Sequence, residues 1–88
     1  MKTFEDLEFK KHEVLGFGFQ AEITFENGYG VSVINGDYAY SSQDKPYEIA
    51  IKKDGSICYD TYITNDVIGY QTKDDVTKVM AQVQNINP

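Results

Sequence analysis

The side chains in this sequence that could act together as a nucleophile and a base are Cys58 and His12. A thiol becomes a nucleophile when a neighbouring base or positive charge stabilises its thiolate form. Cys58 alternates with Ile57 and Tyr59 in an apolar stretch, where a thiol acts as a small hydrophobic side chain, and His12 lies in a polar stretch. The sequence therefore predicts a structural cysteine, a solvated histidine and no enzymatic activity.

Carboxylates near the middle of the chain offer oxygen ligands for a divalent cation. Asp60 and Asp66 flank a short loop, and Asn65 lies beside them. Hard cations prefer such oxygens, but this spacing matches no calcium loop, and single loop carboxylates usually accept backbone N–H bonds. We therefore predict no metal ligands.

Residues 16–21 read G-F-G-F-Q-A, which has the spelling of a dinucleotide-binding fingerprint. That motif requires a helix N-terminus after it, because the pyrophosphate binds there. Here an alternating strand pattern follows instead, so we expect no bound cofactor.

Tyrosine is the most suggestive residue type, because the chain has seven tyrosines and no tryptophan. Tyr47 and Tyr59 alternate with isoleucines and are predicted to lie in the core. Other tyrosines lie in expected loops, where amphipathic rings give contact area at low entropic cost. An alternative is that these loop rings cover the ends of the core with their hydroxyl groups in water. The predicted partner-binding residues are Tyr38, Tyr40, Tyr62, Asp66 and Tyr70.

These loops must be held by a sheet, and the central part of that sheet is expected between residues 17 and 34. Alternating apolar residues predict two strands joined by a turn at Glu26-Asn27-Gly28. A three-residue turn with Gly28 in the left-handed region pairs Ile23 with Val31, whereas a two-residue turn would move the valines to the other face. We therefore predict the three-residue turn.

A second hairpin is expected between residues 47 and 59, with a turn at Lys53-Asp54-Gly55. The same three-residue register would pair Ile51 with Ile57 and Ile49 with Tyr59. It would place Cys58 on the opposite face.

The last element is predicted to be an amphipathic helix. Thr72 and Asp75 have the spacing of a capping box, and apolar residues recur at helical spacing from Val76 to Ile86. We also expect a short turn capped by Thr3, an edge strand over 8–14 and a turn or 3₁₀ segment within 60–71. The prediction is one α+β domain over 1–88: an antiparallel sheet of four to five strands, formed by two consecutive hairpins and packed by one C-terminal helix.

Charge and composition exclude several classes of function. The net charge is −6 and every basic residue is a lysine, so the chain lacks the arginine fork that grips phosphates and would repel a nucleic-acid backbone. No apolar run approaches the length of a membrane span, and one cysteine cannot form an intrachain disulfide. We therefore expect a soluble cytoplasmic protein that binds neither nucleic acid nor membrane.

Several stretches occur together that resemble uncharacterised small proteins, of about this length, from bacteriophages and prophages. They are M-K-T-F-E-D-L-E-F at 1–9, N-G-Y-G-V-S-V-I at 27–34, Y-E-I-A-I at 47–51, C-Y-D-T at 58–61, I-T-N-D-V-I-G-Y at 63–70 and D-V-T-K-V-M-A-Q-V-Q at 75–84. The resemblance implies a phage genetic setting and expression in a bacterial host cytoplasm, but no particular activity.

Two functional hypotheses follow. The leading one is a non-enzymatic phage-type module that binds a host or phage protein through its loop tyrosines and modulates or inhibits a host protein, for example a defence protein. The alternative is a small-ligand or nucleotide-binding protein that acts as a sponge, which requires a concave pocket. Homodimerisation through a sheet edge is compatible with both.

Overall fold

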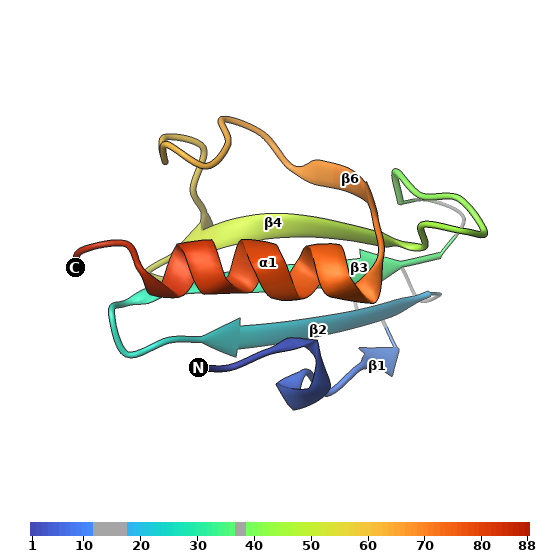
Figure 1. The fold of residues 1–88 in the computed structure, drawn as a ribbon, viewed down its shortest axis with the longest axis horizontal. Coiled ribbons are helices and arrows are strands. Elements are labelled where there is room, and N and C mark those ends of the chain that lie inside the picture. The colour runs from blue at the N-terminus through green and yellow to red at the C-terminus, as the bar shows by residue number, and fades with distance from the viewer. Residues whose placement is uncertain (12–17, 37–38) are drawn as a thin grey trace.

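The fold is an antiparallel sheet with one helix lying across one of its faces (Figure 1). The computed structural model describes residues 1–11, 18–36 and 39–88. The predicted α+β class, with a C-terminal helix packed on the sheet, is confirmed.

The sheet has six strands within the described residues, and two of them are only two residues long. Strands β1 to β4 are neighbours in chain order, and β5 and β6 both pair with the other side of β4. The elements are η1 (Phe4–Asp6), β1 (Lys10–Lys11), β2 (Phe19–Thr24), β3 (Tyr29–Asn35), β4 (Tyr47–Lys53), β5 (Ser56–Ile57), β6 (Ile68–Gln71) and α1 (Lys73–Gln84).

The first hairpin, β2–β3, has the predicted register. Ile23 pairs with Val31, and the amide of Phe25 donates to the carbonyl of Tyr29 at 2.7 Å. Gly28 has a φ of +87°, as the three-residue turn requires. The strand that follows Gly18 also confirms that the glycine-rich stretch before β2 does not lead into a helix.

The second hairpin, β4–β5, does not have the predicted register. Lys53 pairs with Ser56, so the turn contains only Asp54 and Gly55, whose φ values are +53° and +84°. Two residues with positive φ are the geometry of a type I′ turn, for which Asp-Gly is a preferred sequence.

This one-residue difference reverses the faces of the residues after the turn. Ile57 pairs with Lys52 and is 46% exposed, whereas Cys58 donates its amide to Ile51 and packs against the core. Tyr59 is 52% exposed, so its predicted core position is also wrong. Both residues of the short strand β5 are exposed, so burial does not fix its register and the turn decides it.

Helix α1 covers the core face of the sheet. Its buried residues are Val76, Val79, Met80 and Val83, which are the predicted apolar stripe. They pack against inward-facing side chains of β3 and β4, which include Val31, Val33, Ile49 and Ile51.

The start of α1 has the predicted capping box. The amide of Asp75 donates to the Thr72 hydroxyl at 3.1 Å, and the amide of Thr72 donates to the Asp75 carboxylate at 3.0 Å. Hydrogen bonding to Thr72 lowers the pKa of Asp75 below its usual value. The backbone amide of Thr72 has the larger effect and its side chain the smaller one. No helix in the described part of the chain is long and apolar enough to cross a membrane.

The N-terminal segment closes one side of the core. The predicted turn after Thr3 is the 3₁₀ helix η1, and the rings of Phe4, Phe9 and Tyr47 pack together with centroids 5.0–5.7 Å apart. This confirms that Tyr47 packs against the core. Of the predicted edge strand, Lys10–Lys11 is β1, and residues 12–17 lie outside the described residues.

The prediction that 60–71 contains only a turn or 3₁₀ segment is wrong at its C-terminal end. Residues Ile68–Gln71 form β6, in which Ile68 pairs with Ile49, the residue predicted to pair with Tyr59. The alternation is weak here because the strand is short and its pairing with β4 is irregular.

Candidate functional site

Tyr40 and Tyr70, two of the predicted partner-binding residues, are brought together by the fold. The amide of Tyr70 donates to the carbonyl of Tyr40 at 2.8 Å. This bond joins the connection after β3 to the edge strand β6. Both side chains remain exposed, at 64% for Tyr40 and 54% for Tyr70. The two residues therefore form an exposed tyrosine pair on a fixed backbone.

The position of Tyr70 depends on a β-bulge. Ile68 pairs with Ile49 and Gln71 with Tyr47, so two residues of β6 stand opposite one residue of β4. Tyr70 is one of these two bulge residues, and its φ is +56°. A left-handed conformation costs a non-glycine residue about 1–2 kcal/mol. Bulges commonly redirect a side chain, and here the bulge holds Tyr70 in an exposed position.

Two residues that sequence reasoning missed fix Tyr40. The Glu48 carboxylate, opposite the bulge, accepts a hydrogen bond from the Tyr40 amide at 2.9 Å. On the other side, a Cβ added at Gly69 would lie 2.6 Å from the Tyr40 Cβ and 2.8 Å from its carbonyl oxygen. The glycine in a strand-like pattern was the available signal, since such glycines often mark a bulge or a close backbone approach.

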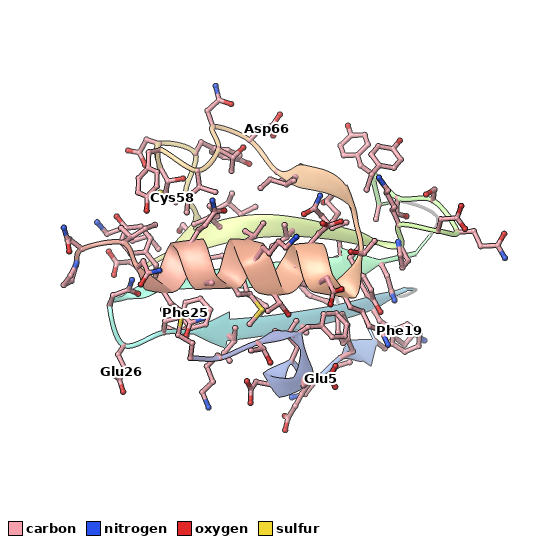
Figure 2. The ribbon with its side chains drawn as sticks, viewed as in Figure 1. Glu5, Phe19, Phe25, Glu26, Cys58 and Asp66 are labelled. Carbon is pink, nitrogen blue, oxygen red and sulfur yellow. The ribbon has the colours of Figure 1, made fainter. Side chains whose placement is uncertain are left out.

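Tyr62 and Asp66 lie apart from this pair. They belong to the segment between β5 and β6, which extends to the opposite end of the long axis from the β3–β4 connection (Figure 1). Tyr62 is 76% exposed. Figure 2 labels Asp66 on the same segment, where its carboxylate accepts the amide of Val67 at 2.7 Å and so stabilises the loop. The fifth predicted residue, Tyr38, lies outside the described residues.

Of the candidate nucleophile and base, the structure describes only Cys58. Cys58 is half-buried, and its Sγ lies 2.9 Å from the Asp60 carboxylate, to which the thiol donates. His12 lies outside the described residues. Within the described ranges, no three histidine, cysteine or acidic side chains gather closely enough to hold a metal ion.

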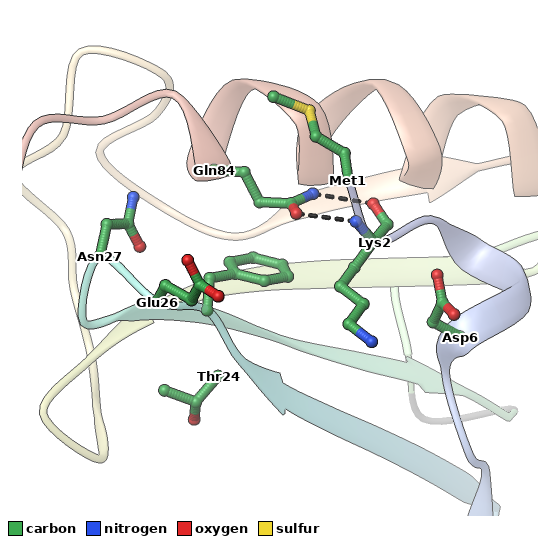
Figure 3. A pocket seen from close by; sticks show the side chains of 8 residues that line it. Met1, Lys2, Asp6, Thr24, Glu26, Asn27 and Gln84 are labelled. Atoms are coloured by element: carbon green, nitrogen blue, oxygen red, sulfur yellow. Dashed lines mark hydrogen bonds between the residues drawn. The ribbon is translucent and has the colours of Figure 1, made fainter.

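A cavity lies away from the tyrosine pair, between the first turn and the end of α1. Its volume is about 740 Å³, and Figure 3 shows Glu26, Asn27 and Asp6 around it. The Gln84 amide holds the backbone of Lys2 by two 2.8 Å hydrogen bonds at its rim. Another hollow, of about 440 Å³, lies between the β3–β4 connection and the start of α1, where Asp44, Lys73 and Asp74 line it.

No protein-family model, curated protein or solved structure matches the chain. The resemblance to small phage proteins therefore stays a prediction.

Proposed function

We propose that this chain is a small, non-enzymatic protein-binding module of phage type, which binds a host or phage protein through the Tyr40–Tyr70 pair. Modulation or inhibition of a host protein, such as a defence protein, is the use that its resemblance to phage proteins favours. The resemblance also favours the cytoplasm of a bacterial host as the place where it acts.

The observation that carries the proposal is the left-handed backbone of Tyr70. Unfavourable backbone conformations of bulky residues persist where the surrounding structure holds them, and they cluster at functional sites. A glycine or asparagine would occupy this φ more easily. The tyrosine instead presents a large ring to solvent, which is costly for stability and useful for binding, because tyrosine is a frequent anchor residue at protein interfaces.

Nucleotide binding is less well supported. Carboxylates line two of the hollows, Glu26 and Asp6 in the larger and Asp44 and Asp74 in the smaller, and each of these hollows also has one lysine. Another hollow, of about 630 Å³ beside Phe19 and Asn35, is lined by no charged side chain that could bind a phosphate. Negative side chains repel phosphate groups, and the chain has no arginine to hold them. A thermal-shift screen against nucleotides checks this directly, and a reproducible rise in Tm would favour the sponge hypothesis instead.

The test of the proposal is a comparison of Tyr70→Asn with Tyr59→Asn. Both tyrosines are about half-exposed, but only Tyr70 is strained. Relief of about 1–2 kcal/mol of strain should offset the lost contacts of the Tyr70 ring, so we expect the free energy of unfolding of Tyr70→Asn to stay within about 1 kcal/mol of wild type. Tyr59→Asn has no strain to relieve and should be the less stable variant.

The immobilised full chain is then used to capture proteins from a bacterial host lysate. We expect a discrete partner that wild type and Tyr59→Asn retain and Tyr70→Asn loses. Equal capture by all three would contradict the proposed surface. Capture of the chain itself, with loss of the dimer in Tyr70→Asn, would identify self-association as the use of this surface.

A further inference from the structure

On the basis of the proposed function, we infer that the partner presents a basic surface whose arginine side chains bind at Tyr40, Tyr70 and Glu48. The three residues meet at one place on the β6 edge, because the Tyr40 backbone is bonded to both the Glu48 carboxylate and the Tyr70 amide. Two exposed aromatic rings beside a carboxylate are the groups that a guanidinium recognises.

The rings have free faces. Among the described residues, the aromatic pairs involve Phe4, Phe9 and Tyr47, and the lysines near rings lie over Tyr29 and Phe4. Neither Tyr40 nor Tyr70 takes part in these contacts. An incoming cation would therefore compete with none of these described contacts at either exposed ring.

The Glu48 carboxylate can accept a further hydrogen bond. One of its carboxylate oxygens accepts from the Tyr40 amide, and no described hydrogen bond uses the other. A guanidinium can stack on an aromatic ring and donate to a carboxylate at the same time, because it is planar and weakly hydrated. A lysine ammonium is a compact, strongly hydrated charge and matches this arrangement less well.

The distribution of charge points to the same kind of partner. Segments 39–48 and 58–75, which join at the tyrosine pair, contain six carboxylates and two lysines. The other described segments contain six carboxylates and six lysines. One of the two lysines of the acidic segments is directed elsewhere, since Lys73 lies over the Phe4 ring. These two segments therefore carry a net charge of −4 and the other described segments carry none, and an excess of negative charge attracts basic partners and repels acidic ones.

The strand edge beside the pair is not open for backbone pairing by a partner. The Tyr70 amide is already bonded to Tyr40, and a bulge interrupts the strand. Bulged edges discourage strand addition. The partner is therefore expected to contact side chains, and an arginine is well suited to reach them.

The direct test uses a fluorescein-labelled arginine homopeptide, with a lysine homopeptide of the same length, and measures anisotropy on the full chain. We expect the arginine peptide to bind roughly 2- to 5-fold more tightly than the lysine peptide. Glu48→Gln keeps the acceptor for the Tyr40 amide and removes only the charge, and it should weaken arginine binding by a similar factor. Tyr40→Leu should do the same.

Matched controls are Glu26→Gln and Tyr59→Leu, which remove a carboxylate and a tyrosine outside the proposed contact. We expect wild-type affinity from both, and amide NMR shifts on peptide addition that centre on Tyr40, Glu48 and Tyr70. Equal affinity for the two peptides, equal weakening by the control variants, or no binding of the arginine peptide would each overturn the inference.

Partner capture separates this inference from the proposed function. Loss of a captured partner in Tyr70→Asn, together with its retention in Glu48→Gln and at high salt, would leave the binding function standing and contradict the basic partner. Capture that does not depend on Tyr70 would contradict the binding function itself.

Discussion

The two hairpins of this protein have similar turn sequences, Glu-Asn-Gly and Lys-Asp-Gly, yet their turns differ in length by one residue. The first turn lies beneath the end of α1, and the Asn27 amide donates to the carbonyls of Val83 and Ile86, both at 2.9 Å. The second turn has no such helix contact in the described structure. Hydrophobic patterning determines register where a helix buries one face, and local turn preference determines it where nothing does.

The largest difference between the hairpins is expected at their glycines. A Cβ at Gly30, in the first hairpin, would overlap the backbone carbonyl of Ile23, whereas one at Gly55 would meet open space. We expect Gly30→Ala to lower the free energy of unfolding by about 3 kcal/mol. Gly55→Ala should cost only the left-handed penalty, about 1–2 kcal/mol. Urea unfolding measures both, and equal losses would contradict the difference in packing.

An exchange of the two turn residues tests the helix contact. Asn27→Asp replaces the donor to the last helix carbonyls with a negative charge at the negative end of the helix, and we expect a loss of about 2 kcal/mol. Asp54→Asn keeps a residue that accepts left-handed φ, so stability should change by less than about 0.5 kcal/mol. Similar losses in both variants would show that the two turns are equivalent after all.

The register of the second hairpin can be tested by substituting one isoleucine in each hairpin, Ile23 in the first and Ile57 in the second. Ile23 packs against the core, and Ile57 is 46% exposed. We expect Ile23→Thr to cost about 1–2 kcal/mol in unfolding free energy and Ile57→Thr about 0.5 kcal/mol or less. The register that the sequence pattern favours would instead bury Ile57 opposite Ile51, and the two losses would then be alike.

The same distinction explains what the sequence could and could not predict. The helix stripe, its cap and the first hairpin were predictable, because burial against a partner element leaves one acceptable periodicity. Tyr59 and Ile57 alternate just as regularly, but no element covers them. Strand β6 was missed because its bulge breaks the alternation at Gly69.

The candidate site followed the same rule. Tyr40, Tyr62 and Tyr70 are exposed, whereas the sequence left open whether such rings cover the ends of the core. The grouping of Tyr40 with Tyr70 was not predictable, because their contact joins the β3–β4 connection to strand β6 and depends on a left-handed backbone that no local pattern indicates. Glu48 contacts Tyr40 from strand β4. The apolar alternation of β4 predicts only which of its residues face the core, and Glu48 is not one of them.

The smallest expected effect is the loss of stability in acid, which should depend on Asp75 at the start of α1 and not on Asn27 at its end. The pKa of Asp75 is lowered in the folded chain, so its contribution to stability is present above the unfolded value, about 3.9, and is lost as pH falls through the folded value. Urea unfolding between pH 5 and pH 2, a range of roughly three units around that value, should show a shallower acid loss in Asp75→Asn than in wild type. Asn27 lies at the other end of α1, and its side-chain amide does not titrate. Asn27→Ala should therefore lose stability with falling pH as steeply as wild type. A flattened slope in Asn27→Ala, or an unchanged one in Asp75→Asn, would contradict this assignment.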